Sequence, residues 1–416
     1  MKRIGVFSAV ILFAALSGSL WAQVTVIRDS ISMGAGYAKQ VYYSFQNGQI
    51  DTALAAGWHL AFEIPIRGAA IRANHARGVV VFQTTKDTNG WTTLTLADTV
   101  TRLYNDNCRW EIGALNQTAA PGNPFDVGWG LYDLNTHIVT GDSLYILGLP
   151  GGIYKKLWVQ KLQGTVYTVR VANLDGSEDT VYAVDKTIAT GRNFVYLNLL
   201  TRQVLNAEPP TSDWDIVFTP YLALLPPSGT PYPVTGVLQN VGVKAARIVL
   251  SSTANPDTLT PSAYSLDSCI STIGYDWKRY DMNTNSWILA DTVYYLVQDK
   301  AGNLWRLRFV GFGGSSTGKV VFEKARLQQA TALAKTSLAS VQTFPNPARE
   351  GFYVTLSTSE TVHATLYTVT GQKVWESFFS GQEVAWIARP AGLPAGTYRL
   401  LLQTVSGTWS ASLLFE

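Results

Sequence analysis

The sequence contains two copies of one pattern of aromatic and β-branched residues. Residues 42–50 (YYSFQNGQI) precede residues 58–62 (WHLAF) in the first copy, and residues 196–204 (YLNLLTRQV) precede residues 214–218 (WDIVF) in the second. Three further pairs of matching segments follow in order, roughly 150 residues apart: residues 129–136 and 277–284, residues 142–147 and 291–296, and residues 152–157 and 302–307. Matches that keep one order and nearly one offset indicate a duplicated structural unit.

Apolar and polar residues alternate through both copies, in short runs bounded by Gly, Asn and Pro. This period of two is typical of β-strands and turns. Only residues 324–335 (KARLQQATALAK) collect helix formers without Gly or Pro, and there we predict a connecting helix. In residues 58–62, alternation places the apolar and aromatic side chains in the core and His59 on the opposite, exposed face, as for Asp215 in the second copy. We therefore predict an all-β fold with two tandem antiparallel β repeats.

The N-terminus has the three parts of a secretion signal. Lys2 and Arg3 form a basic start, residues 4–16 form an apolar middle, and Ala22 is a small residue at the expected cleavage site. We predict that residues 1–22 are a signal peptide. No later segment approaches 18 uninterrupted apolar residues, so we expect no transmembrane segment in the mature chain. The formal net charge of +3 does not indicate a nucleic-acid-binding surface.

The C-terminal residues 342–416 carry three short motifs in a fixed order. They are a PNP triplet (Pro345, Asn346, Pro347), LYTVTGQKV with Gly371 (residues 366–374), and LPAGTYRLLLQT with Gly396 and Tyr398 (residues 393–404). The glycines supply turn conformations that are costly for other residues. This segment resembles the sorting domain of the type IX secretion system, although its LLFE ending lacks the basic residues of many members. The resemblance implies a small immunoglobulin-like β-sandwich, contact with the type IX machinery, and delivery to the surface or exterior of a Gram-negative bacterium.

The repeated body carries a second set of motifs. The second copy has WDIVF, Asn240, residues 293–303 (VYYLVQDKAGN) and residues 318–322 (GKVVF), and the first copy has YYSFQNG, WHLAF, Asn74 and residues 144–152 (LYILGLPGG). These segments resemble the HmuY-like family of bacterial haem-binding proteins. The resemblance implies an antiparallel β fold, an extracellular ligand-binding ancestry, and haem held by two axial histidines. In the corresponding region the first copy offers only His75 and His137, both in turn-like segments, and the second copy has no histidine.

These features divide the chain into five predicted parts. They are a signal peptide (1–22), a first HmuY-like repeat (23–182), a second HmuY-like repeat (183–327), a linker (328–341) and a sorting domain (342–416).

Cys108 and Cys269 are the only cysteines of the chain. An oxidising compartment would permit them to form a disulfide, and the long loop they would close gives such a bond about 4 to 5 kcal/mol of stabilisation on the chain-entropy theory. The sequence leaves pairing open, because it does not place the two Cα atoms. Two isolated cysteines lack the clustered spacing of a zinc site.

Catalytic motifs are weak throughout the chain. Residues 314–318 (GSSTG) satisfy the GxSxG pattern of hydrolase nucleophiles, but a strand rather than a helix follows, which favours a hairpin loop. Residues 281–286 (DMNTNS) begin like a calcium loop but lack its central Gly and its final Glu, which favours a turn. Asp215, Asp276 and Asp281 are the candidates for a carboxylate pair in glycoside hydrolysis, and none clusters with a second acid in the repeated segments.

We therefore predict a secreted or cell-surface protein that is not an enzyme and binds a ligand whose identity the sequence does not give. Three alternatives stay open: a haem-binding protein, a surface adhesin or structural component that contacts a glycan, and a glycoside-type hydrolase.

Overall fold

The computed structural model describes residues 25–65, 67–328, 341–355, 360–380, 384–404 and 408–416. The chain forms two compact units, residues 1–329 and residues 330–416. Antiparallel strands make up nearly all regular structure in both, which confirms the predicted all-β fold. The predicted signal peptide (1–22) and most of the predicted linker (328–341) lie outside the described residues. In the described part of the chain, no helix has the length and apolar character needed to cross a membrane.

The first lobe of the N-terminal unit, residues 60–205, is a sandwich of two antiparallel sheets. The larger sheet has the order β13 (Thr180–Asp185), β12 (Val166–Asn173), β11 (Ile153–Gln163), β10 (Ser143–Leu149), β6 (Val80–Asp87) and β7 (Thr99–Leu103), and β9 (Ile138–Gly141) pairs with both β8 (Gly130–Tyr132) and β11. The smaller sheet has the order β15 (Gln203–Leu205), β14 (Phe194–Asn198), β4 (Leu60–Glu63) and β5 (Ile71–Ala73). Side chains from both sheets, including Phe62, Tyr145 and Tyr167, form the core between them.

The second lobe, residues 26–54 and 216–328, has the same arrangement. Its larger sheet has the order β1 (Val26–Ser32), β23 (Lys319–Gln328), β22 (Leu304–Phe312), β21 (Val293–Gln298) and β18 (Lys244–Val249). Its smaller sheet has the order β17 (Thr230–Gln239), β16 (Ile216–Leu225), β2 (Lys39–Ser44) and β3 (Gly48–Leu54), and β19 (Lys278–Asp281) and β20 (Ser286–Leu289) form a separate hairpin. Tyr43, Phe218 and Phe322 lie at the centre of the core.

Short helical turns join the strands of both lobes. They are η1 (Ala35–Tyr37), η2 (His75–Arg77), η3 (Thr88–Thr93), η4 (Leu96–Asp98), η5 (Ala114–Asn116), η6 (Lys186–Ala189), η7 (Pro256–Thr258), η8 (Pro261–Ala263) and α1 (Gly314–Thr317).

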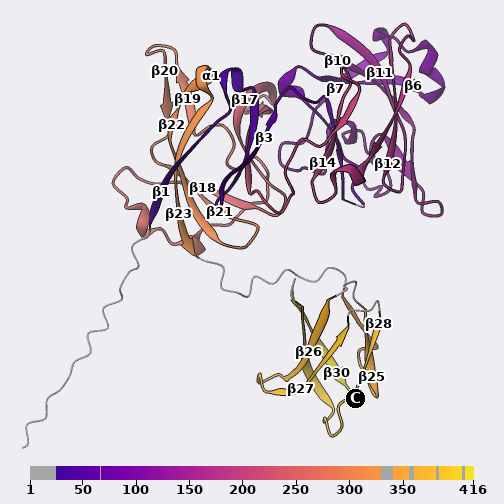
Figure 1. Cartoon of the computed structure of the whole chain (residues 1–416), viewed down its shortest axis with the longest axis vertical. Helices are drawn as coiled ribbons and strands as arrows, with labels where there is room; N and C mark the ends of the chain where they lie inside the picture. The colour runs from indigo at the N-terminus through magenta and orange to yellow at the C-terminus, as the bar shows by residue number, and fades with distance from the viewer. Residues whose placement is uncertain (1–24, 66, 329–340, 356–359, 381–383, 405–407) are drawn as a thin grey trace, which may run out of the picture. The chain divides into compact units, whose positions relative to one another are not determined.

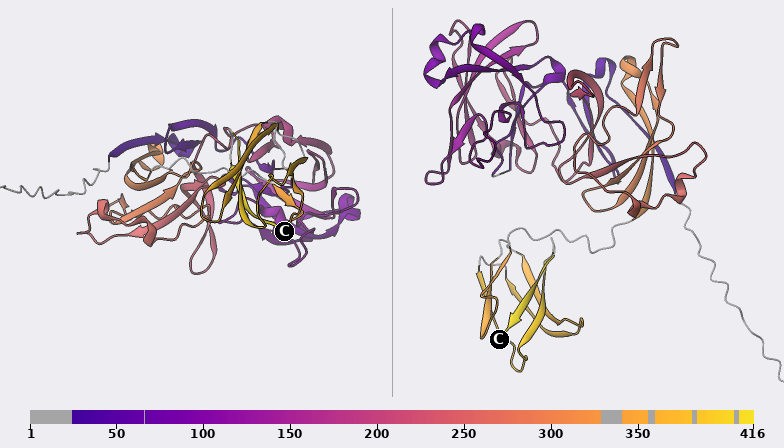
Figure 2. Two further views of the ribbon diagram at one scale, coloured as in Figure 1. Left: turned by 90° about the horizontal axis from the view of Figure 1, so that it is seen from below. Right: turned by 180° about the vertical axis from the view of Figure 1, so that it is seen from behind.

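The two copies of the sequence repeat exchange strands. β2 of the first copy pairs with β16 of the second, with Val41 opposite Phe218. In the same way β14 of the second copy pairs with β4 of the first, with Val195 opposite Phe62. The indigo β1 also runs beside the orange β23, although the two strands lie at opposite ends of the unit's sequence (Figures 1 and 2). Each lobe therefore combines strands from both copies, and the predicted border between residues 182 and 183 falls inside β13.

The predicted helix at residues 324–335 is wrong for the part that the structure describes. Residues 324–328 continue β23, which pairs with β1 on one side and β22 on the other. Ladder hydrogen bonds to two neighbouring strands outweigh the helix propensity of a short Lys, Ala, Arg and Leu run. Residues 329–335 lie outside the described residues.

The expected exposure of His59 and Asp215 is also wrong. Their side chains are 4% and 6% exposed, respectively. Each side chain accepts hydrogen bonds from backbone amides near the end of its own lobe: Nδ1 of His59 from Leu199 (3.0 Å), and the carboxylate of Asp215 from Phe45 (2.8 Å) and Lys300 (3.3 Å). Alternation marks a solvent-facing side only where water covers one face of a sheet.

The C-terminal unit is a separate two-sheet sandwich with its own core. One sheet has the order β24 (Gln342–Phe344), β25 (Gly351–Thr355) and β28 (Val384–Ala388), and the other has the order β27 (Lys373–Ser380), β26 (Thr361–Thr368), β29 (Gly396–Gln403) and β30 (Thr408–Phe415). Phe352, Leu366, Leu400 and Phe415 are buried between the sheets.

Candidate functional site

A narrow cavity, called the junction cavity below, lies where the two lobes meet. Its walls come from the smaller sheet of each lobe and from the loop after β7. They include Trp58, Phe194 and Tyr196 of the first lobe, Tyr42, Trp214 and Val217 of the second lobe's sheet region, and Trp110 of the loop. The cavity volume is about 80 Å³, which is the space of roughly two to three water molecules in the liquid. A cavity of this size admits a ligand of only a few heavy atoms.

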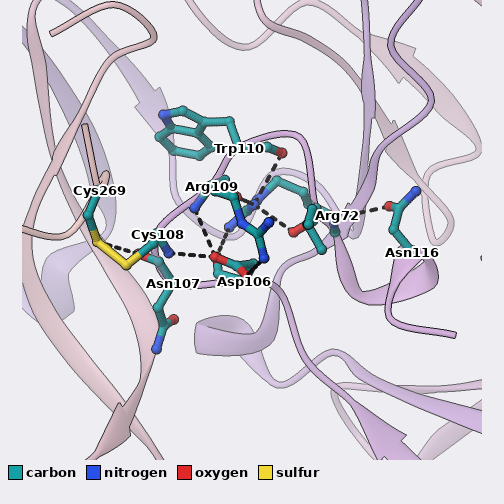
Figure 3. A network of polar contacts seen from close by, with 10 residues as sticks. Arg72, Asp106, Asn107, Cys108, Arg109, Trp110, Asn116 and Cys269 are labelled. Atoms are coloured by element: carbon teal, nitrogen blue, oxygen red, sulfur yellow. Dashed lines mark hydrogen bonds and ion pairs between the residues drawn. A yellow bond between two sulfur atoms is a disulfide. The ribbon is translucent and has the colours of Figure 1, made fainter. Parts of the chain in front are cut away.

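A buried arginine shapes the loop that forms one wall of this cavity (Figure 3). The guanidinium of Arg72, on β5, donates hydrogen bonds to four backbone carbonyls, those of Asp106 (3.0 Å), Arg109 (2.7 Å), Trp110 (3.2 Å) and Ile112 (3.1 Å). Burial lowers the pKa of Arg72 to about 10, so the side chain stays charged at neutral pH. The carbonyl dipoles stabilise this charge, and one side chain fixes four carbonyls of the loop.

The same loop joins the two lobes. Cys108 forms a disulfide with Cys269 of the second lobe (Figure 3). The amide of Ile270 donates to the carbonyl of Cys108 (3.0 Å), and the indole Nε1 of Trp110 donates to the carbonyl of Gln239 (2.8 Å). One covalent bond and two hydrogen bonds therefore fix the lobes on either side of the cavity.

Glu208 places a carboxyl group in the cavity wall. Its Oε1 accepts a hydrogen bond from the amide of Phe194 (2.7 Å), and its Oε2 accepts one from the hydroxyl of Tyr196 (3.0 Å). Burial raises the pKa of Glu208 to about 7, and these two donors oppose that rise only in part. The group therefore changes its charge close to neutral pH.

Two further polar atoms in the wall have no hydrogen-bond partner among the described residues. They are Nε2 of His75 and the indole Nε1 of Trp214. Nδ1 of His75 lies 2.8 Å from the carbonyl of Val79, so Nδ1 carries the proton and Nε2 is an acceptor. Burial lowers the pKa of His75 to about 4, which keeps the ring neutral. Both atoms are themselves buried, so each is a polar group without a partner inside the packed wall.

A second and larger cavity, called the apolar cleft below, lies within the first lobe. Its volume is about 820 Å³, in the range of small-molecule sites. The lining is mainly apolar, with Pro124, Phe125, Val127, Leu134, Val139 and Leu162 beside Arg67, Tyr132 and His137. The rings of Phe125 and Tyr132 stack with centroids 6.3 Å apart, and the Tyr132 hydroxyl lies 2.7 Å from Nδ1 of His137.

The structure does not bring the two candidate haem ligands together. His75 lines the junction cavity, whereas His137 lines the apolar cleft. His137 occupies a turn with φ 57°, and Asn285, in the corresponding turn of the second lobe, has φ 51°. The two residues therefore serve alike as turn residues, and the chain does not form a two-histidine haem site from His75 and His137.

The candidate acids have separate structural contacts. Asp215 is buried and accepts hydrogen bonds from the amides of Phe45 (2.8 Å) and Lys300 (3.3 Å). Asp276 pairs with Arg247 (3.7 Å), and Asp281 accepts from the amide of residue 283 in the turn between β19 and β20. The GSSTG segment forms α1, between β22 and β23. Within the described ranges, no three His, Cys, Asp or Glu side chains cluster as metal ligands would.

The motif residues of the C-terminal unit stabilise that unit itself. Asn346, between Pro345 and Pro347, binds β30 twice: its Nδ2 donates to the carbonyl of Ser412 and its Oδ1 accepts from the amide of Leu414, both at 2.9 Å. Gly371 has φ 88° in the turn between β26 and β27, a conformation that favours glycine. Tyr398 is buried on β29, which begins at Gly396, and its hydroxyl donates to the carbonyl of Pro394 (2.9 Å).

Sequence reasoning missed the main polar groups of the junction cavity. Glu208 and Arg72 belong to no motif, and each reaches the site through pairings between distant strands. The one available signal was Asn74 and Asn240, which the two copies share. Each donates to the carbonyl of a wall tryptophan, Trp58 (2.9 Å) and Trp214 (2.7 Å) respectively.

No protein-family model matches this chain, and a search of curated proteins finds no match.

Proposed function

We propose that this chain is an exported, non-enzymatic binding protein. Its C-terminal unit directs transport through the type IX secretion system, and its N-terminal unit binds a small apolar ligand in the apolar cleft. The cleft is the observation that carries the binding function, because its size and mainly apolar lining, with a few polar groups, are typical of ligand sites.

The export proposal rests on the resemblance of residues 342–416 to sorting domains and on the independence of that unit. A domain that a secretion system recognises must fold independently of the protein to which it is attached. The C-terminal unit has its own core, and its motif residues Asn346, Gly371 and Tyr398 have structural roles inside it. These roles fit a module that is recognised as a folded body.

Cell fractionation tests the export proposal. The full chain should reach the cell surface or the medium, and a chain ending at residue 341 should accumulate in the periplasm. Alkylation of free thiols provides the control, because a correctly folded periplasmic product retains the Cys108 to Cys269 disulfide. Surface delivery of the folded, truncated chain would contradict the proposal.

Binding in the apolar cleft is tested with a matched pair of leucine variants. Leu134 lines the cleft and is 60% exposed, whereas Leu131 is 49% exposed and lies outside the lining. Titration with an apolar fluorescent dye should show saturable binding that weakens at least roughly tenfold in Leu134→Asp, because a carboxylate in an apolar site is costly to desolvate. Leu131→Asp should bind as the wild type does. Equal affinities in the two variants would exclude the cleft.

Haem is the second candidate ligand, and His137 is the observation that favours it. One imidazole borders a cleft with aromatic walls, although the second histidine of the family's site is missing there. A saturable change in the Soret band on haem titration, abolished in His137→Ala, would favour this ligand. No Soret change would remove it.

A further inference from the structure

We propose that the junction cavity is a binding site for a small primary ammonium ion, with Glu208 as the counter-charge. This site goes beyond the proposed function, because it is separate from the apolar cleft and does not depend on the export route.

The walls of the cavity suit an organic cation. Four of the aromatic rings form a continuous series in which neighbouring centroids are 5.8 Å apart for Trp110 and Phe194, 6.5 Å for Phe194 and Tyr196, and 5.2 Å for Tyr196 and Trp58. Faces of aromatic rings attract cations through their quadrupoles, most strongly where water is excluded. The volume of about 80 Å³ limits the ligand to a few heavy atoms.

The carboxyl group of Glu208 lacks a cationic partner from the protein. Among the described residues, no Lys, Arg or His side chain forms an ion pair with it. Arg192 is near, but its Nε donates to the backbone carbonyl of Glu208 (2.7 Å). Arg72 is held by four carbonyls of the loop and stacks on Trp110 at 5.0 Å. A buried carboxylate without a cationic partner is costly, and a ligand ammonium group would lower that cost.

The carboxylate oxygens of Glu208 define the ligand further. Each accepts one hydrogen bond from the protein, and a carboxylate oxygen can accept a second. An ammonium group with N–H bonds can use this capacity, which quaternary ammonium ions cannot. Ethanolamine, a primary ammonium ion with few heavy atoms, is the probe.

Binding should depend on pH through Glu208. The titratable and charged groups around it are Tyr42, Tyr196 and Arg192, together with His75 and Arg72 in the same wall. The pKa of His75 is about 4, that of Arg72 is about 10, and burial raises the pKa of both tyrosines well above the usual value. Of the cavity groups with a shifted pKa, Glu208 alone changes charge between pH 6 and pH 8.

Isothermal titration of the mature chain with ethanolamine tests the site, with the fluorescence of the wall tryptophans as a second signal. Saturable binding at pH 8 should weaken roughly tenfold at pH 6, because a carboxyl with a pKa of about 7 is mostly protonated there. Glu208→Gln should weaken binding at least roughly tenfold at pH 8 and remove the pH dependence. Glu63→Gln changes another buried carboxyl, outside this cavity wall, and should leave binding unchanged.

Tetramethylammonium has the charge without N–H bonds and should bind more weakly than ethanolamine. A urea unfolding curve for each variant establishes that it is folded. Absence of saturable ethanolamine binding at pH 8, or equal affinity in folded Glu208→Gln, would overturn the proposal. Export and dye binding in the cleft are measured separately, so failure here leaves the proposed function standing.

Discussion

Replacement of both cysteines by serine should lower the free energy of unfolding of the N-terminal unit by about 3 to 5 kcal/mol. Cys108 and Cys269 are separated by 161 residues. A crosslink across a loop of this length restricts the unfolded chain and stabilises the folded state by about 5 kcal/mol on the chain-entropy theory, with smaller values where other effects intervene.

The contacts around the disulfide indicate that the loss arises mainly in the unfolded state. The amide of Ile270 still donates to the carbonyl of residue 108, and the Trp110 indole still donates to Gln239, when the sulfur atoms are gone. Arg72 still holds the loop through four carbonyls. The folded double variant should therefore keep the junction cavity and bind ethanolamine as the wild type does.

Urea unfolding of the mature chain, followed by tryptophan fluorescence, measures this effect. The wild type in a reducing agent should unfold as Cys108→Ser, Cys269→Ser does, and the oxidised wild type should be more stable than both. A loss below about 1 kcal/mol, or two free thiols in the unreduced native protein, would refute the reasoning.

Three further predictions concern single residues. Burial raises the pKa of Glu208 from 4.5 to about 7 in the folded chain, so the folded chain binds the carboxyl proton more tightly than the unfolded chain does. The free energy of unfolding should therefore fall by about 3 kcal/mol as the pH rises from 4.5 to 7. Urea curves at pH 5 and pH 8 should show this loss for the wild type and not for Glu208→Gln. Tyr43→Phe loses a hydrogen bond of 2.7 Å to Asp29 and should lower the free energy of unfolding of the N-terminal unit by about 1.5 kcal/mol. Tyr353→Phe, at an exposed position of the C-terminal unit, should leave the free energy of unfolding unchanged in the same urea assay. Asn346→Ala removes two hydrogen bonds to β30 and should destabilise the C-terminal unit by about 2 kcal/mol, seen as an earlier thermal transition of that unit and a smaller exported fraction.

The sequence predicts the strands better than their partners. Alternation and turn residues identify the β segments, because each strand must present side chains to a core. The exchange of strands between the copies is invisible at this level, since both copies carry the same aromatic pattern. Alternation does not predict the burial of His59 and Asp215, because both side chains accept hydrogen bonds from backbone amides that are distant in the sequence. Glu208 stands between Ala207 and two prolines without any motif, so only the folded chain reveals its burial.

The pairing of β1 with β23 has a consequence for the order in which the chain folds. All strands of the first lobe lie within residues 60–205, so this lobe can form as soon as that stretch has been synthesised. Residues 26–54 are synthesised earlier, but their partners β16 and β23 follow only after the first lobe is complete. Their unpaired edges stay open to aggregation during that interval, since long-range β pairing forms slowly. A chaperone that holds these first strands until the unit is complete would therefore raise the yield of folded protein.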